Sequence, residues 1–520
     1  MCVNKYFPLY QVLSHHLLVL LGALAFVINS ASCILRPNSS SLASCKKSFS
    51  SPSTFKTLIE TTITFRLKNV SGGGHNLKKH KDIEFISDTT SVNPHSRAIP
   101  TQIGTLNLRQ SAIVIKIIRN RIAKYTNFVA NNVIMWIERN NTDKILEAVR
   151  TRPVVLLTGV RQAGKSSLLK KLFPVADYVT LDKILMAAQA QENPERFLSG
   201  FTKQVIIDEI QYAPGLFRDL KVIVDQEREV KGKWILTGSQ QFPLMQQVSE
   251  SLAGRVKILR LESLSASELN KSNLLLNPID LLWKGGFPEI WAEGLPAAEY
   301  FDDYIQTYLE RDLKQILNVS NLRDFRRFLS LLAVRVGQLL NYSDLAKDAG
   351  VAPNTIKAWV NALEVSGLIY LLPPYYHNLG KRLIKAPKVY FCDNGLISNL
   401  LNIDSADALE RSPHRGSIWE NFVFTEMIKN GYVTGKDLFF YRDQNGVEID
   451  FITVKSGKTN LIEAKCSERP DPKKLNFRKV ASIFPNGVSS YCACTINEPG
   501  VIQLQEFGLY NPLSGTSAPI

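Results

Sequence analysis

The sequence predicts an α/β protein that contains a parallel sheet between helices. Two apolar runs, residues 154–157 and 204–207, each end in a glycine-containing or acidic turn, as strands that lead into functional loops do. Helix-like runs such as 143–150 and 214–226 alternate with them, which is typical of parallel α/β sheets. The length of 520 residues leaves room for roughly three or four domains at ~100–200 residues each.

The first apolar run is followed by a phosphate-loop pattern, G-x-x-x-x-G-K-[ST], and then by a helix-like run over 167–173. Glycines in such a loop let backbone N–H groups face phosphates, while the lysine reaches the β- and γ-phosphates and the serine hydroxyl is a ligand of Mg²⁺. The predicted nucleotide-binding residues are Gly159, Val160, Arg161, Gln162, Ala163, Gly164, Lys165, Ser166 and Ser167. The pattern therefore predicts a site for ATP or GTP together with Mg²⁺.

Two acids end the second apolar run, 43 positions after the lysine of the loop. Asp208 is predicted to hold the same Mg²⁺, and Glu209 is predicted to polarise a water molecule for attack on the γ-phosphate. Because both motifs follow apolar strands in the expected order, they indicate a site that binds and hydrolyses a nucleotide.

Polar residues after two further predicted strands are candidates for completing this site. Ser239, after a strand at 233–236, is the first candidate for touching the γ-phosphate and Thr237 the second; alternatively, these hydroxyls cap the next helix. Arg255 precedes a strand at 256–259 and is a candidate arginine finger, acting within the chain or on a neighbouring subunit. A surface salt bridge is the alternative role for Arg255.

Together, these motifs resemble one group of prokaryotic AAA+ ATPases. The resemblance rests on the phosphate loop and on residues 206–211, 235–239, 252–255 and 285–289, and it extends from about residue 135 to about residue 510. It implies a five-stranded sheet with the phosphate loop after the first strand, an arginine finger at Arg255, a helical lid that contains residues 310–312, and a C-terminal domain of the restriction-endonuclease-like class. The expected domains are an ATPase core at 135–270, a lid or connector at 271–335, a middle module at 336–395 and the C-terminal domain at 396–520.

The middle module resembles a winged helix-turn-helix. Residues 342–370 predict two helices around a turn at Gly350, with Ser343 as a cap, and strands at 368–372 and 388–391 predict a wing. The apolar positions expected on one face are Leu345, Ala349, Ile356, Val360, Leu363 and Leu368. The opposite face offers Asn354, Thr355, Lys357 and Asn361, and the wing offers Lys381, Arg382, Lys385 and Lys388. With so few cations on the helix, contact with DNA and docking of a protein both remain open.

Carboxylates and a lysine recur on predicted strands of the C-terminal domain. Asp450 lies on one strand, and Glu463 and Lys465 share a face of the next, because residues two apart on a strand point the same way. The pattern resembles the nuclease signature Asp then Glu-x-Lys, with Glu420 on the preceding helix as a further acid. It implies that Asp450, Glu463 and Glu420 bind a divalent metal and that Lys465 stabilises charge on a phosphate. The alternative is an edge strand on which Asp450 and Lys465 form an ion pair.

The N-terminal quarter differs from the rest in composition. Residues 1–134 hold 16 Lys and Arg against 4 Asp and Glu, so they carry +12 of the net charge of +15 and the remainder is nearly neutral. Residues 17–28 form an apolar run shorter than the ~20 residues that span a bilayer. Three interpretations are open: translation from too early a start, with Met135 as the true first residue; a disordered or targeting extension; or a membrane tether. We expect a cytoplasmic protein, because its seven cysteines show no metal-binding or disulfide spacing.

Two functions follow from these observations. The first is an ATP-hydrolysing enzyme that engages DNA and cuts it with the C-terminal carboxylates. The second is an ATP-controlled switch or docking protein whose nuclease-like domain binds a protein partner without cutting. A homo-oligomer is expected if Arg255 acts on a neighbouring subunit.

Overall fold

The computed structural model describes residues 136–238, 251–275, 277–309, 322–375, 386–484, 487–498 and 500–518, together with three short strands nearer the N-terminus. The chain divides into two compact units, Met1–Val133 and Ile134–Ile520. In the first unit, β1 (Thr62–Arg66), β2 (Ile83–Asp88) and β3 (Thr105–Leu106) form an antiparallel sheet. The predictions for residues 17–28 and for Met135 lie outside the described residues. Among the residues that the structure describes, no helix combines the length and apolar character needed to cross a bilayer.

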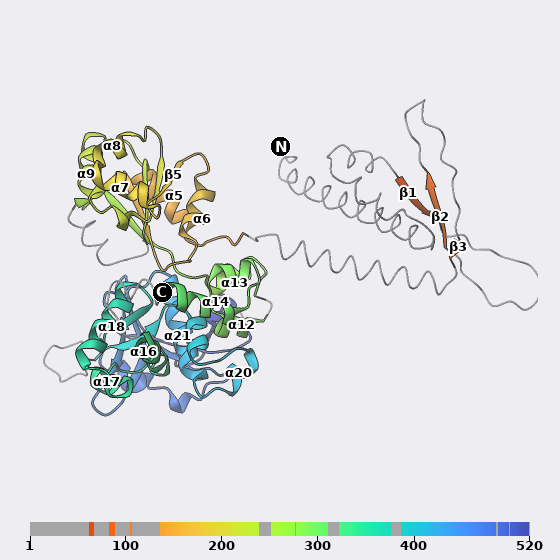
Figure 1. Ribbon diagram of the computed structural model, residues 1–520. Helices are drawn as coiled ribbons and strands as arrows, with labels where there is room; N and C mark the ends of the chain where they lie inside the picture. The colour runs from red at the N-terminus through yellow and green to blue at the C-terminus, as the bar shows by residue number, and fades with distance from the viewer. Residues whose placement is uncertain are drawn as a thin grey trace, which may run out of the picture. The chain divides into compact units, whose positions relative to one another are not determined.

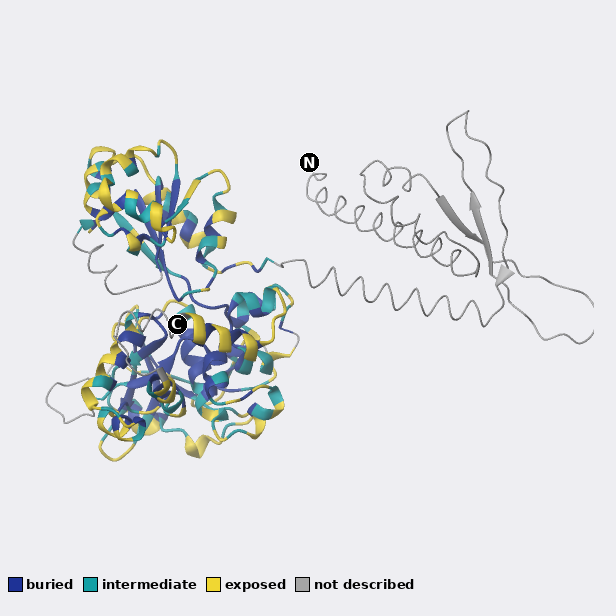
Figure 2. Cartoon of the chain, viewed as in Figure 1, coloured by how far each residue is buried: buried dark blue, intermediate teal, exposed yellow. Residues whose placement is uncertain are grey.

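The second unit begins with the predicted five-stranded parallel sheet (Figure 1). Its strands are β4 (Val154–Thr158), β5 (Asp177–Thr180), β6 (Val205–Asp208), β7 (Trp234–Gly238) and β8 (Val256–Arg260). They lie in the order β5-β6-β7-β4-β8, and every pair is parallel. Strands covered on both faces are expected to be apolar throughout, and all residues of β4, β6 and β7 are indeed buried, as the dark blue of Figure 2 shows.

Helices cover both faces of this sheet. They are α5 (Thr142–Thr151), α6 (Lys165–Leu172), α7 (Ile184–Glu192), α8 (Pro194–Ser199) and α9 (Leu216–Gln226), with a 3-10 turn, η1 (Ile210–Tyr212). The amphipathic α9 buries Leu216, Leu220 and Val224, which recur every four residues and therefore share one face. Ile145 of α5 and Leu168 of α6 pack in a second cluster against the same strands.

The connector is a set of short helices that joins the sheet to the rest of the unit. It contains α11 (Ala266–Lys271), α12 (Pro278–Lys284), α13 (Pro288–Ala292), α14 (Ala297–Tyr304) and the π-helical η2 (Ile305–Leu309). Two glycines allow close packing here, since a Cβ at Gly285 would lie 1.7 Å from Oδ1 of Asp393 and one at Gly286 would lie 2.3 Å from the carbonyl oxygen of Leu264. The predicted lid residues 310–312 lie outside the described residues.

The helices and strands predicted for the middle module are present. They are α17 (Tyr342–Ala349), α18 (Pro353–Val365), β9 (Ile369–Leu372) and β10 (Lys388–Phe391), preceded by α16 (Leu322–Val334). All six predicted apolar positions are buried, and Asn354, Lys357 and Asn361 are exposed as expected. The predicted cap was wrong: the side chain of Asn341, not Ser343, accepts the N–H groups of Ser343 and Asp344 at the start of α17. Lys381, Arg382 and Lys385 lie outside the described residues.

The C-terminal region is a six-stranded sheet with helices. Its strands are β11 (Leu438–Arg442), β12 (Glu448–Lys455), β13 (Lys458–Ala464), β14 (Ser489–Ala493), β15 (Val501–Gln503) and β16 (Gly508–Tyr510), in the order β11-β12-β13-β14-β16-β15. The helices are α19 (Asn394–Leu400), α20 (Ala406–Arg411), α21 (Arg415–Lys429) and α22 (Phe477–Ala481), with 3-10 turns η3 (Pro472–Lys474) and η4 (Pro512–Ser514). β12 pairs with β11 and β13 antiparallel, and β13 pairs with β14 parallel.

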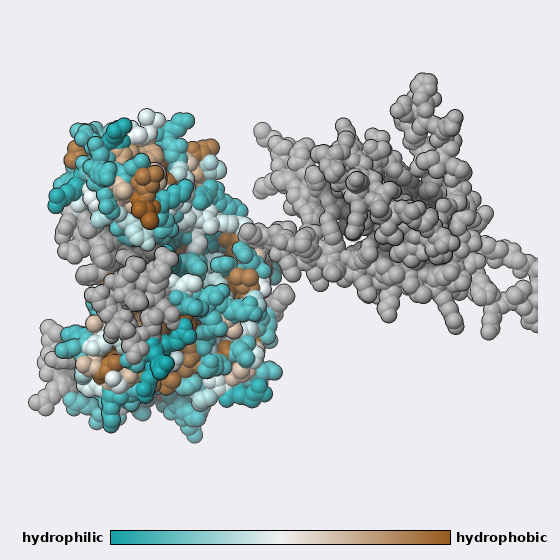
Figure 3. All heavy atoms as spheres, viewed as in Figure 1, coloured by the Kyte–Doolittle hydropathy of each residue, from teal (hydrophilic) through white to brown (hydrophobic). Residues whose placement is uncertain are grey.

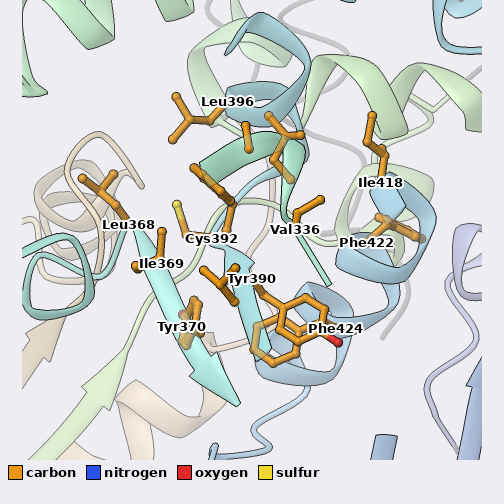
Figure 4. Packing of buried hydrophobic residues seen from close by; sticks show 14 of the residues in the cluster. Val336, Leu368, Ile369, Tyr370, Tyr390, Cys392, Leu396, Ile418, Phe422 and Phe424 are labelled. Atoms are coloured by element: carbon orange, nitrogen blue, oxygen red, sulfur yellow. The ribbon is translucent and has the colours of Figure 1, made fainter. Parts of the chain in front are cut away.

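An aromatic cluster joins β9 and β10 to α21 (Figure 4). The rings of Tyr390 and Phe424 stack with centroids 4.3 Å apart, and Tyr370 meets Phe424 edge-on at 5.3 Å. The Tyr370 hydroxyl, buried at one end of this cluster, donates to Oε1 of Glu262 at 3.0 Å. Because Glu262 follows β8 closely, the cluster connects the end of the parallel sheet to α21.

Candidate functional site

The loop after β4 has the backbone conformation that its glycines permit. Gly159 has φ +143°, and a Cβ there would lie 2.0 Å from the carbonyl oxygen of Leu261, so no larger residue fits. Gly164 has φ +86° and precedes the first turn of α6. Between them, Gln162 adopts φ +63°, a conformation that non-glycine residues take rarely and mostly at functional sites. The predicted phosphate loop therefore leads from a buried strand into a helix N-terminus, where backbone N–H groups attract anions.

Lys165 lies inside this loop and not on the helix surface. Its side-chain ammonium donates to the carbonyl oxygens of Gly159 at 3.0 Å and Val160 at 2.9 Å, and the residue is only 5% exposed. Burial lowers the pKa of Lys165, while the nearby charges of Glu209 and Asp208 oppose that shift. The ammonium is thus placed where a bound phosphate would reach it.

Asp208, at the end of β6, is the centre of a set of hydroxyl groups. Oγ of Ser166 donates to both of its carboxylate oxygens, at 2.7 and 2.9 Å, and Oγ1 of Thr237 donates to Oδ1. The hydroxyl of Tyr178, on β5, donates to Oδ2 at 2.6 Å. Burial, followed by this hydrogen bond, raises the pKa of Tyr178, so the phenol stays a donor. A serine hydroxyl beside a carboxylate is a set of hard oxygen ligands, and it fits Mg²⁺.

Glu209 is held in a strained position between β6 and η1. Its φ of 57° and ψ of 50° are left-handed, and such strain is retained where the surrounding structure enforces it. Its backbone N–H donates to Oγ1 of Thr237 at 3.1 Å, and its carboxylate accepts from Nε2 of Gln211. Thr237 therefore contacts both predicted acids, whereas Ser239, the first candidate for that role, lies outside the described residues.

Two residues that the sequence did not indicate hold the loop from outside. The buried Arg139 donates to the carbonyl oxygen of Ala163 at 2.8 Å and to Oε1 of Glu268 at 3.1 Å. The hydroxyl of Tyr300, on α14, donates to Oε1 of Gln162 at 2.8 Å. Arg139 is 24 positions from Ala163 and 129 from Glu268, and Tyr300 is 138 from Gln162, so no local pattern could reveal these contacts.

Arg255 does not lie near the phosphate loop of its own chain. It precedes β8, whereas the loop follows β4, and the two strands are parallel neighbours with Val154 opposite Val256. A five-residue strand therefore separates them, roughly 15 Å at ~3.3 Å per residue. Arg255 instead forms two hydrogen bonds with Asp225, at 2.6 and 2.8 Å. The interpretation of Arg255 as a finger within the chain was wrong, because the parallel pairing of β4 and β8 places Arg255 at the opposite end of the strands from the loop.

The C-terminal carboxylates are brought together as predicted. Nζ of Lys465 lies 2.8 Å from Oε2 of Glu463 and 3.5 Å from Oδ2 of Asp450, across the β12–β13 pair. The backbone N–H of Ala464 donates to Oδ2 of Asp450, and that of Asn476 donates to Oε1 of Glu463. Glu420, on α21, accepts the hydroxyl of Tyr390 at 2.6 Å.

A second lysine, which the sequence analysis placed on a DNA-facing wing, lies among these acids. Lys388 is 1% exposed, and its Nζ lies 3.0 Å from Glu420, 2.5 Å from Glu448 and 3.8 Å from Asp450. In the described part of the chain no three acidic, histidine or cysteine side chains are arranged to hold a metal ion. Two lysine ammoniums lie against the carboxylates of Glu420, Asp450 and Glu463, and the metal centre expected from these three acids stays a prediction.

Comparison with known proteins agrees with the first of these two sites. Residues 151–270 match an AAA domain, residues 277–407 match a domain of unknown function (DUF8612) and residues 415–498 match another (DUF4143). Uncharacterized protein Rv2008c of Mycobacterium tuberculosis is 33% identical over 364 residues, which cover 68% of this chain and 81% of that protein. Uncharacterized protein MJ1544 of Methanocaldococcus jannaschii is 24% identical over 296 residues, covering 52% of this chain and 63% of that protein.

Solved structures include the Walker-type ATPase PABY2304 of Pyrococcus abyssi, at 16% identity and a TM-score of 0.36, covering 51% of this chain and 96% of that one. The family models that match residues 277–407 and 415–498 describe domains of unknown function, so these matches do not confirm the winged-helix or the nuclease-like resemblance. The chain belongs to the same family as the mycobacterial protein, and its residues 151–270 form an AAA-type P-loop ATPase domain.

Proposed function

We propose that the chain is an Mg²⁺-dependent ATP hydrolase whose nucleotide state controls its C-terminal domain, and that this domain docks a protein partner without cutting DNA. The observation that carries the first part is the hydrogen-bonded set of Ser166, Asp208, Thr237 and Glu209 beside the buried Lys165. It joins the phosphate loop to both acids through the ends of three neighbouring strands.

Each residue of this set has one role in the proposal. Lys165 neutralises the β- and γ-phosphates, and the backbone N–H groups from Gly159 to Ser167 face them. Ser166 and Asp208 hold Mg²⁺, which supplies positive charge against the phosphate oxygens when it is bound. Glu209 accepts the proton of the attacking water, and Thr237 fixes the backbone of Glu209 relative to Asp208.

Contacts of the phosphate loop and of the residues just after β8 support the control of other parts of the chain. Tyr300 links Gln162 to α14, and Arg139 links Ala163 to the start of α11 through Glu268. Glu262 reaches Tyr370 and hence the aromatic cluster on α21. A shift of the loop on nucleotide binding would therefore alter contacts that continue into the C-terminal region. In this proposal, two packed arrangements of those contacts are the states that the nucleotide selects.

The docking role is favoured over DNA cleavage by the charges of the C-terminal region. Lys388, on β10, is buried and cannot face DNA. Among the described residues of α18, Lys357 is the cation on the exposed face. An acidic cluster already matched by ammonium groups is also a poor place for metal-dependent hydrolysis. Figure 3 shows hydrophobic residues gathered in several places on the molecular surface, where a protein partner could be buried.

The proposal keeps Arg255 as an arginine finger only toward a neighbouring subunit of a homo-oligomer. Arg255 and Asp225 are each about a quarter to a third exposed, at 27% and 30% of their side chains, so the pair is accessible from outside. A neighbouring subunit could then present its phosphate loop to Arg255 once the pair with Asp225 opens.

The test of ATP hydrolysis compares substitutions in the full chain. Lys165→Ala is expected to lose ATP binding, and Glu209→Gln is expected to retain it while hydrolysis falls. Lys203→Ala and Glu229→Gln, at exposed positions away from this site, are the matched controls. Normal hydrolysis by both Lys165→Ala and Glu209→Gln would contradict the proposed site.

A further inference from the structure

The C-terminal acidic cluster, defined as Glu420, Glu448, Asp450 and Glu463, comes from three different elements. Glu420 lies on α21, Glu448 and Asp450 lie two residues apart on β12, and Glu463 lies on β13. Residues two apart on a strand share a face, so Glu448 and Asp450 both point toward α21 and β10. The cluster is thus built by the fold and not by one stretch of sequence.

Two lysines share these carboxylates between them. Lys388 contacts Glu420, Glu448 and Asp450, and Lys465 contacts Asp450 and Glu463. Asp450 lies between the two ammoniums, with Oδ1 toward Lys388 and Oδ2 toward Lys465. Arg442 adds a third cation at the edge, 2.9 Å from Oε2 of Glu448.

The surrounding carboxylates keep the side chain of Lys388 protonated. Burial alone would lower the pKa of Lys388, but the carboxylates of Glu420, Asp450 and Glu448 outweigh it and raise the pKa. The ammonium is therefore charged, fully buried and in contact with three acids from two elements. An isolated charge at this depth would be strongly unfavourable, so the lysine and the acids stabilise one another.

We infer that the ammonium of Lys388 is the resident cation of this cluster and takes the place of the divalent metal that the Asp and Glu-x-Lys pattern suggests. A metal ion shared by Glu420 and Asp450 would have to enter the space that the ammonium fills. It would also meet the positive charge of Lys388 at a distance of a few ångströms, in surroundings where charges are weakly screened.

The same geometry implies a metal site that is present but blocked. Lys388→Met keeps the length and apolar stem of the side chain and removes the charge. Glu420, Glu448 and Asp450 would then lose the cation that contacts all three, while Lys465 and Arg442 stay beside Asp450 and Glu448. Carboxylates that face one another in that arrangement attract Mn²⁺ or Mg²⁺. This inference does not depend on ATP hydrolysis, because no nucleotide-binding residue takes part.

The test is a titration of the full chain with Mn²⁺ in the absence of nucleotide, followed by electron paramagnetic resonance of the free ion and by calorimetry. The wild-type chain and Asp450→Asn are expected to bind Mn²⁺ equally, because Asp450 holds lysines and not metal. Lys388→Met is expected to gain one Mn²⁺, with affinity about tenfold or more above the wild type, since one repelling charge is removed. Lys388→Arg, which keeps the charge, should gain none, and Lys388→Met with Asp450→Asn should lose what Lys388→Met gained.

Loss of wild-type Mn²⁺ binding on Asp450→Asn would overturn the inference, and that comparison holds even if Lys388→Met does not fold. A folded Lys388→Met chain, judged by near-ultraviolet circular dichroism, that binds no more Mn²⁺ than the wild type would also overturn it.

Discussion

Two acidic centres in this chain are held by different kinds of donor. In the ATPase domain, the carboxylate of Asp208 accepts from the hydroxyls of Ser166, Thr237 and Tyr178, which are neutral. In the C-terminal region, Asp450 and its neighbours are held by the ammoniums of Lys388 and Lys465. Hydroxyl groups orient a carboxylate and leave its negative charge available, whereas an ammonium cancels it. In this chain, the comparison separates a carboxylate that neutral hydroxyls orient toward a metal from carboxylates that ammonium groups already contact.

The largest expected effect separates the two centres by activity. Glu209→Gln should slow ATP hydrolysis by roughly 10²-fold or more, the usual scale for losing a general base, while ATP binding persists. Glu463→Gln, the same change in the C-terminal cluster, should leave the rate within about twofold of the wild type, because no contact of Glu463 involves the ATPase domain. Steady-state phosphate release measures both, and equal losses in the two variants would remove the distinction.

The next effect concerns stability. Lys388→Met should destabilise the chain by about 3–5 kcal/mol, the range for breaking a buried ion pair by removing one partner. Lys388→Arg should cost less because it retains the charge. Urea unfolding followed by tryptophan fluorescence is the measurement, with Trp419 buried beside Glu420 on α21. A change below about 1 kcal/mol for Lys388→Met would show that the lysine is not needed to balance the acids.

A smaller effect should depend on pH. Burial raises the pKa of Glu420 from 4.5 to about 7, although Lys388 acts in the opposite direction. Since the folded chain then binds a proton that the unfolded chain has released, this residue's contribution to stability is greatest below pH 4.5 and is lost as the pH rises through about 7. The expected loss is about 1–3 kcal/mol. Glu420→Gln should flatten the difference in unfolding free energy between pH 5 and pH 7.5, and an unchanged slope would contradict the assignment.

The smallest effect tests the hydroxyls around Asp208. Tyr178→Phe removes one donor to Oδ2 and should raise the Mg²⁺ concentration for half-maximal ATPase activity by roughly threefold, with little change in kcat. Tyr212→Phe, a similarly exposed tyrosine in the same domain, is the control. A fall in kcat without a change in the Mg²⁺ requirement would mean that Tyr178 acts on something other than the Asp208 carboxylate.

Much of the fold and of the first site could be predicted because their signals are local. The phosphate loop occupies consecutive residues, and the apolar runs around Val154 and Val205 mark their strands directly. The strands β14 to β16 were missed, since they are short and only partly apolar. Lys388 was assigned to a wing because its own strand carries no sign of the acids, the nearest of which, Glu420, is 32 positions away. Arg255 was misplaced within the chain because it precedes its strand whereas the phosphate loop follows a parallel neighbour, so the two lie at opposite ends of the strands.

The contact between Gly286 and Asp393 has a consequence for how the chain is made. The backbone N–H of Gly286 donates to Oδ2 of Asp393 at 2.8 Å, across 107 positions of sequence. A ribosome adding ~5–20 residues per second needs roughly 5–20 s to synthesise that interval. During this time the five-stranded sheet is complete in sequence while the connector still lacks its partner. The segment around Gly285 and Gly286 is therefore one part of the emerging chain that chaperones or proteases would meet in an unfinished state.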